Sequence, residues 1–202
     1  MTLWRGIRPL ILASQSRARR ILLADAGLEF EVLPADIDER GLQQGSKLSA
    51  PGDIASLLAG EKARWVSARS AGHYVIGADQ TLALGNRLFN KPDNRAAAAE
   101  QLRVLSGQTH DLNSAIAVVL DGKLVFQTVA VAHMRMRPLS EHDIRVYLDE
   151  AGEAVTSSVG AYQLEGLGVH LFDRIEGDHF TILGLPLLPL LAFLRRERMI
   201  GL

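Results

Sequence analysis

Short apolar runs alternate with helix-like patterns along the first half of the chain. Apolar runs over 10–13, 29–33 and 74–78 predict three strands. Apolar positions at helical spacing predict helices over 17–26 and 53–70, and Gly27 is expected to end the first of them. Strands that alternate with helices in this way favour an α/β fold.

The second half continues this alternation and adds a hairpin. Asp121-Gly122 is a strong two-residue turn signal between apolar runs over 113–120 and 123–134. We expect helices over 94–105, 140–150 and 186–198, and further strands over 169–175 and 180–183. No fixed repeat, low-complexity tract or linker interrupts the pattern, so we expect a single domain over 1–202.

Two segments depart from the regular pattern. Residues 34–51 are polar and irregular, which predicts a loop longer than the usual ~4–6 residues, and such loops are often functional. In the helix over 53–70, one apolar stripe is formed by Ile54, Leu57, Leu58 and Trp65. Glu61 falls inside this stripe and Lys62 lies at its edge. A charge on a core-facing stripe costs free energy unless it is paired or faces a cavity.

The composition narrows the classes of protein. The chain has 202 residues, 48% of them hydrophobic, with a formal net charge of −1 and no cysteine. Disulfides, thiolate zinc sites and a cysteine nucleophile are therefore excluded. The absence of a basic excess argues against a polymeric nucleic acid partner. No apolar segment reaches the ~18 residues of a membrane span, and no leader pattern is present, so we expect a cytoplasmic protein that does not enter the membrane.

The known short motifs of several enzyme classes are missing. The sequence contains no Walker A loop, no zinc-peptidase motif and no nucleophile elbow, and a dinucleotide fingerprint that starts at Gly166 fails at Leu171. The six histidines lack the spacing of metal ligands. Hydride transfer, acyl transfer by a serine elbow and zinc-peptidase chemistry therefore lose support.

A strand-to-helix turn supplies the first candidate site. Two hydroxyls and three guanidinium groups follow one another there, on Ser14, Ser16, Arg17, Arg19 and Arg20. Together with the free N–H groups of a helix start they could cradle a phosphate. The charge alone is equally compatible with a solvated basic face of an amphipathic helix.

Acidic residues supply the other candidates. Glu39 lies in the acidic stretch 36–40, Asp79 follows an apolar strand, and Glu165 stands alone in a turn-rich segment. Lys91 follows Asp79 by about a dozen residues. Carboxylates that hold a hard divalent cation, and bases that neutralise phosphate charge, are what phosphoryl transfer requires. An isolated aspartate after a strand is more often a turn former.

These segments, in this order, resemble the signature of the Maf family of nucleoside triphosphate pyrophosphatases, and the resemblance runs from Leu10 to about Arg196. The matching pieces are Leu-Ile-Leu-Ala-Ser-Gln-Ser with Arg19-Arg20, residues 24–39, Glu61-Lys62-Ala63, Gly77-Ala78-Asp79, Lys91-Pro92, Leu105-Ser106-Gly107, Glu165-Gly166 and Gly184-Leu185-Pro186-Leu187. The resemblance implies a Maf/ITPase-like fold, with a mixed twisted sheet flanked by helices and two lobes around a central cleft. It also implies a homodimer and hydrolysis of a nucleoside triphosphate to the monophosphate and pyrophosphate with a divalent cation, Mg²⁺ or Mn²⁺.

The resemblance also implies roles for individual residues. Asp79 matches the proton acceptor, and Glu39 joins it as a metal-binding carboxylate. Lys62 and Lys91 match basic positions of the catalytic site. The substrate and its phosphates are assigned to Ser14, Ser16, Arg19, Arg20, Gln80 and Glu165.

Details of the sequence resemble the 7-methyl-GTP branch of the family more than the dTTP/UTP branch. Gln80 and Glu165 stand where the dTTP/UTP branch usually has Thr and Gln, and an acidic residue near the base suits a cationic methylated guanine. Arg17 and Ala18 replace the usual Pro and Arg or Trp, which removes a fixed φ at the helix start. A dTTP/UTP pyrophosphatase remains an alternative, as does a nucleotide-binding regulator of division or septum formation with little catalysis.

Overall fold

The fold is built on one mixed β-sheet. The computed structural model describes residues 3–201. Its strands are β1 (Leu10–Leu12), β2 (Phe30–Val32), β3 (Tyr74–Leu84), β4 (Arg87–Phe89), β5 (Thr109–Leu120), β6 (Lys123–Met136) and β7 (Phe172–Glu176). They lie in the order β2-β1-β3-β5-β6-β7, with β4 paired to β3. Within residues 3–201, the pairings of β1 with β2 and β3 are parallel, and the other strand pairings are antiparallel.

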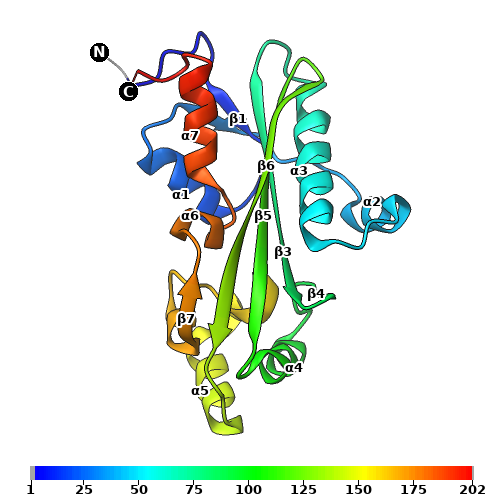
Figure 1. Cartoon of the computed structure of the whole chain (residues 1–202), viewed down its shortest axis with the longest axis vertical. Coiled ribbons are helices and arrows are strands. Elements are labelled where there is room, and N and C mark those ends of the chain that lie inside the picture. The colour runs from blue at the N-terminus through cyan, green and yellow to red at the C-terminus, as the bar shows by residue number, and fades with distance from the viewer. Residues whose placement is uncertain (1–2, 202) are drawn as a thin grey trace.

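Helices flank this sheet. They are α1 (Arg17–Asp25), α2 (Glu39–Ser46), α3 (Pro51–Ser67), α4 (Arg95–Leu105), α5 (Glu141–Ala151), α6 (His179–Ile182) and α7 (Leu187–Arg196). Short 3₁₀ turns cover Gly152–Thr156, Val159–Ala161 and Leu167–Leu171. In Figure 1, α3 lies on one side of the upper half of the sheet, and α1 and α7 lie on the other. The prediction of an α/β fold with a mixed sheet flanked by helices is therefore confirmed.

Alternation along the central strands separates two cores. Ile76 and Ile116 point to the side of α1 and α7, whereas Val75 and Ala115 point to the side of α3. The layer under α3 is thin because its buried side chains are mostly alanines. Gly77 is part of this close packing, since a Cβ there would lie 2.0 Å from the carbonyl oxygen of Ala59.

A second lobe continues below. The long strands β3, β5 and β6 extend into it, where they pack with α4 and α5 around a third core that contains Leu82, Leu102, Leu112 and Met134. The two lobes thus share the strands β3, β5 and β6. Any cleft between the lobes must lie beside these strands.

Several local predictions were wrong. Residues 39–46, expected in a loop, form α2, whose start is capped by the Asp38 carboxylate accepting from the N–H of Gly41 at 2.9 Å. The strand expected over 180–183 is the short helix α6, and the one over 169–175 starts only at Phe172. β3 does not end at Ala78 but runs on to Leu84.

The charged positions of α3 also differ from the predicted stripe. The helix buries its small residues, such as Ala59 and Ala63, whereas Trp65 is only half-buried. Glu61 is therefore not a core charge but binds Arg64 at 2.6 Å on the surface of the helix.

Within residues 3–201, no helix is long and apolar enough to cross a membrane.

Candidate active site

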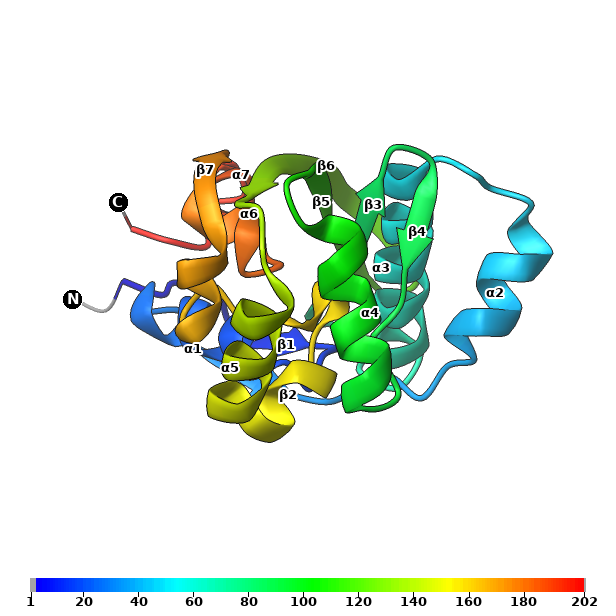
Figure 2. The ribbon, with the colours of Figure 1, turned by 90° about the horizontal axis from the view of Figure 1, so that it is seen from below.

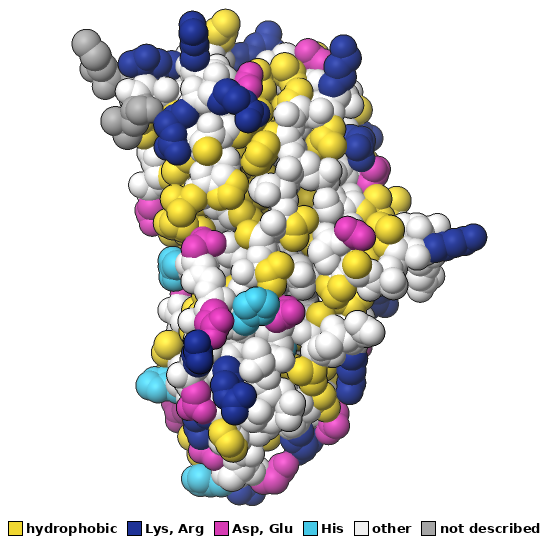
Figure 3. Space-filling model, viewed as in Figure 1, with side chains coloured by type: hydrophobic (Ala, Val, Ile, Leu, Met, Phe, Trp, Pro, Cys, Tyr) yellow, Lys and Arg dark blue, Asp and Glu magenta, His cyan; other side chains and the backbone are white. Residues whose placement is uncertain are grey.

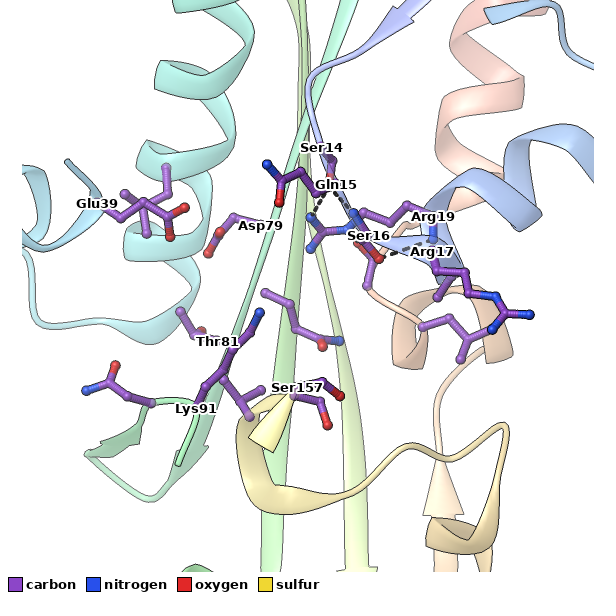
Figure 4. A pocket seen from close by; sticks show the side chains of 18 of the residues that line it. Ser14, Gln15, Ser16, Arg17, Arg19, Glu39, Asp79, Thr81, Lys91 and Ser157 are labelled. Atoms are coloured by element: carbon purple, nitrogen blue, oxygen red, sulfur yellow. Dashed lines mark hydrogen bonds between the residues drawn. The ribbon is translucent and has the colours of Figure 1, made fainter. Parts of the chain in front are cut away.

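A cleft of about 1390 Å³ opens between the two lobes. One wall comes from the β1–α1 turn and the 182–184 turn, and the others from α2, α3, the middle of β3, residues 89–93 and residues 156–165. The volume exceeds the ~300–1,000 Å³ of ordinary small-molecule pockets, which leaves room for a ligand with several phosphate groups. Figure 4 shows Glu39, Asp79, Ser14 and Lys91 around this space.

An acid–lysine–acid cluster lies on the side of α3. The Nζ of Lys62 is 2.6 Å from Oδ1 of Asp79 and 2.9 Å from Oε1 of Glu39. Asp79 projects from the middle of β3 and is 7% exposed, whereas the side chain of Glu39, in the first turn of α2, is 51% exposed. The charge predicted at the edge of the α3 stripe is therefore stabilised both by pairing and by facing the cleft.

The environment of Asp79 favours a carboxyl group that binds protons more readily than usual. Burial raises the pKa of Asp79, and the positive charges of Lys62 and Arg19 oppose part of that rise. A carboxylate whose pKa is raised is a stronger base than an exposed aspartate. This is the property that a proton acceptor in a hydrolytic site requires.

The β1–α1 turn forms the facing wall. Ser16 caps α1 by accepting from the N–H of Arg19 at 3.4 Å, and Ser14 Oγ accepts from the N–H of Ser16 at 3.2 Å. The start of a helix leaves N–H groups without intrahelical acceptors, and Arg17 and Ala18 at this start line the cleft. The two hydroxyls and the helix start that were predicted to cradle a phosphate therefore lie together, on the side of the cleft opposite α3 (Figure 4).

Arg19 is the structural centre of this turn. Its Nη1 donates to Ser14 Oγ at 3.1 Å and to the carbonyl oxygen of Ala78 at 2.7 Å, and its Nε donates to the carbonyl oxygen of Gly184 at 2.8 Å. Burial lowers the pKa of Arg19, and Asp79 and Glu39 oppose that shift. Arg19 thus links the turn to β3 and to the 182–184 turn, besides lining the cleft.

The remaining predicted residues differ in their placement. Lys91 is exposed and its ammonium points into the cleft from below in Figure 4, and Glu165 also lines the cleft. Gln80 borders the cleft, but its amide donates to Ser114 Oγ at 2.8 Å and to the carbonyl oxygen of Ile182 at 3.0 Å. Arg20 is exposed on α1 and does not line the cleft, so the structure does not bring it to the predicted phosphate cradle.

Some residues of the cleft wall were not expected from the sequence. Thr81 lines it and donates its hydroxyl to the carbonyl oxygen of Pro51 at 3.0 Å. Its position two residues after Asp79 would have placed it on the same face of a longer strand. Tyr162 also borders the cleft, and behind it the buried Nε2 of His110 lies 2.7 Å from the tyrosine hydroxyl. No short motif marks this pair, because the two residues lie 52 positions apart.

The donor set of the cluster determines which cation it could bind. Glu39 and Asp79 direct carboxylate oxygens at one point, now held by the Lys62 ammonium. Two carboxylates suit Mg²⁺ or Mn²⁺ when a ligand adds phosphate oxygens. Among residues 3–201 no group of three or more histidine, cysteine, aspartate or glutamate side chains could hold a metal by itself. The residues therefore fit a cation that is shared with a ligand.

A mixed α/β sheet with two acids, a lysine and a helix start around one cleft defines an α/β protein with a polar cleft between two lobes. Residues 9–197 match the family described as Maf-like protein. The chain belongs to the Maf family, as the resemblance in the sequence implied.

Individual relatives cover the whole chain. A protein of Bradyrhizobium diazoefficiens named nucleoside triphosphate pyrophosphatase is 69% identical over 201 residues, which is 100% of both chains. A protein of Brucella abortus named 7-methyl-GTP pyrophosphatase is 51% identical over 95% of this chain and 97% of its own. Among solved structures, a nucleoside-triphosphatase (dITP/XTP pyrophosphatase) of Mycobacterium abscessus has a TM-score of 0.46 and 18% identity, over 95% of this chain and 96% of that one.

Proposed function

We propose that the protein is a nucleoside triphosphate pyrophosphatase, which hydrolyses its substrate to the monophosphate and pyrophosphate. The observation that carries the proposal is the placement of a buried, lysine-paired Asp79 across one cleft from the hydroxyls and helix start at 14–19. The names of full-length relatives at 69% and 51% identity support the same reaction.

In the proposed reaction, Asp79 orients a water molecule and accepts its proton as the water oxygen attacks the α-phosphorus. The bond from the α-phosphorus to the oxygen that bridges to the β-phosphate breaks, and pyrophosphate leaves with that oxygen. Lys62, Lys91 and Arg19 supply positive charge for the phosphate oxygens, and the Ser14–Ser16 turn supplies hydrogen-bond donors. Gln80 keeps the floor of the cleft in place through its bonds to Ser114 and Ile182.

A divalent cation, Mg²⁺ or Mn²⁺, is part of the proposal. Glu39 and Asp79 would hold it together with phosphate oxygens of the substrate. When bound, such an ion neutralises charge on the phosphates and makes pyrophosphate a better leaving group.

Release of pyrophosphate by the purified protein tests the proposal. Asp79→Asn keeps the size of the side chain but removes its basicity, and we expect a loss of at least ~10²-fold in kcat. Asp173→Asn, an exposed aspartate on β7, is the matched control and should retain wild-type turnover. Unchanged turnover of Asp79→Asn would remove this residue from the reaction. Thermal stabilisation by nucleotides without product release would instead favour a nucleotide-binding regulator.

For the substrate, we propose 7-methyl-GTP. Glu165 is an exposed residue at the border of the cleft and can offer negative charge to a cationic base. The Brucella abortus relative that carries this substrate in its name supports the proposal. Hydrolysis of 7-methyl-GTP, dTTP, UTP and CTP should be compared, and a clear preference for dTTP would favour the dTTP/UTP alternative.

We also propose that two copies of the chain associate. Within residues 3–201, the 123–132 half of β6 pairs only with β5, and it presents Val125, Val129 and Val131 at 38–41% exposure. Figure 3 shows apolar side chains along this face. Unpaired edges of this kind favour pairing with another strand. Sedimentation of wild type and Val129→Lys tests it: a dimer that the substitution dissociates supports this edge, and a wild-type monomer refutes it.

A further inference from the structure

Lys62 already fills the position at which the two acids of the cleft converge. Its Nζ lies 2.6 Å from Asp79 and 2.9 Å from Glu39, and its side chain is only 12% exposed. These two carboxylates are also the proposed metal ligands. An ammonium group and a divalent cation cannot occupy the same point between them.

We propose that Lys62 is a built-in counter-cation that excludes divalent metal from the nucleotide-free protein. The metal then enters only together with the triphosphate, whose oxygens take over Lys62 and release Glu39 and Asp79. This inference rests on the proposed function, because it assumes that the ligand is a metal–triphosphate complex.

The charges of the site support this order of events. Glu39 and Asp79 carry two negative charges and Lys62 one positive charge, so the cluster has a net charge of −1. A divalent cation that approached it alone would have to displace the ammonium and remain close to it, in a buried site where like charges repel strongly. The half-buried guanidinium of Arg19 interacts electrostatically with Asp79 and adds a second positive charge that repels a free divalent cation. A triphosphate offers Lys62 new partners and brings the missing oxygen ligands.

The attachment of α2 supports it independently. No side chain of this helix is fully buried, and the helix lies at the outer edge of the molecule, beyond α3, in Figure 2. Glu39 in its first turn reaches the cleft through the ion pair with Lys62. Lys62 therefore holds one of the two metal-binding acids in place until a substrate arrives.

Binding of Mn²⁺ to the nucleotide-free protein tests the proposal without any turnover. Free and bound Mn²⁺ are distinguished by electron paramagnetic resonance. We expect weak binding by wild type and an affinity at least about tenfold higher for Lys62→Met, because the competing charge is gone. Lys62→Gln is a second neutral variant, with a polar side chain, for the case that Lys62→Met does not fold.

Two controls separate a local effect from a change in total charge. Lys91→Met removes a lysine of the same cleft that has no ion pair among residues 3–201, and should change Mn²⁺ affinity less than about threefold. Adding Glu39→Gln to the neutral Lys62 variant should abolish the gain in Mn²⁺ affinity, because one of the two carboxylates is then missing. An affinity of the folded neutral variants equal to or below that of wild type would overturn the proposal, as would tight Mn²⁺ binding by nucleotide-free wild type.

The failure of this inference can be distinguished from failure of the proposed function. Pyrophosphate release by wild type tests the function and does not depend on whether Lys62 excludes metal. A wild type that hydrolyses nucleotide and also binds Mn²⁺ tightly on its own would contradict only the counter-cation role.

Discussion

Replacing Arg19 should destabilise the protein in the absence of any ligand. The guanidinium donates to Ser14 Oγ and to the carbonyl oxygens of Ala78 and Gly184, and thereby joins the β1–α1 turn to β3 and to the turn before α7. Arg19→Ala leaves two carbonyl oxygens in a part-buried region without this donor. Each carbonyl oxygen that loses its donor lowers the free energy of unfolding by about 1–3 kcal/mol.

The magnitude follows from these bonds and from the burial of the charge. Removing a buried cation recovers part of its desolvation cost, which the lowered pKa of Arg19 reflects. Three charge-assisted bonds at ~1.5–3 kcal/mol each amount to about 4.5–9 kcal/mol, and recovery of several kcal/mol of desolvation leaves a net loss of about 3 kcal/mol in the free energy of unfolding. Water that enters the site would reduce this value, and it would not change its sign.

Urea denaturation of the nucleotide-free protein measures the effect. Arg20→Ala is the matched control, because Arg20 is the next residue of α1, exposed and outside the cleft, and should change stability by less than about 0.5 kcal/mol. If Arg19 served only to bind phosphate, both variants would be equally stable without ligand. Equal midpoints with equal slopes would therefore refute a structural role for the Arg19 guanidinium.

Two further predictions concern pH and packing. Burial raises the pKa of Asp79, and Asp79 must be ionised to accept a proton. We therefore expect kcat/KM to fall as the pH is lowered, with a midpoint above the ordinary aspartate pKa of about 3.9. A pH–rate profile checks this, and an acidic limb at or below that value would contradict it. Gly77→Ala should cost about 3 kcal/mol or more, because its Cβ would lie 2.0 Å from the carbonyl oxygen of Ala59. Gly45→Ala in α2, with open space around it, should instead stabilise by up to ~1 kcal/mol, and thermal unfolding compares the two.

Elements with a clear hydrophobic period could be predicted from the sequence. The hairpin around Asp121-Gly122 and the helices α1, α3, α4, α5 and α7 lie close to their expected bounds. In contrast, α2 has no buried face and therefore no apolar period, although Asp38 is a capping residue at its start. The apolar run at 180–183 is too short for its period to distinguish a strand from a helix.

The site could be predicted in its residue types and only partly in its contacts. Lys62, at the edge of an apolar helical stripe, was expected to be paired or to face a cavity, and it does both. Asp79 was expected at a strand end because a polar residue interrupts the apolar run, yet it lies inside β3. The bond from Arg19 to Gly184 joins residues 165 positions apart, and no local pattern encodes such a contact.

The cleft divides its positive charges into two groups with different tasks. Arg19 and Lys62 are already bound to carbonyl oxygens and carboxylates, so they are oriented before a ligand arrives. Among residues 3–201, Arg17, Arg40 and Lys91 line the same cleft without ion pairs. The unpaired charges of Arg17, Arg40 and Lys91 can attract a triphosphate over a distance, and salt screens this attraction. The paired charges of Arg19 and Lys62 act only after the triphosphate is in contact with them. Added salt should therefore lower kcat/KM through slower association and leave kcat nearly unchanged, and an equal loss of both would show that the paired charges are screened as well.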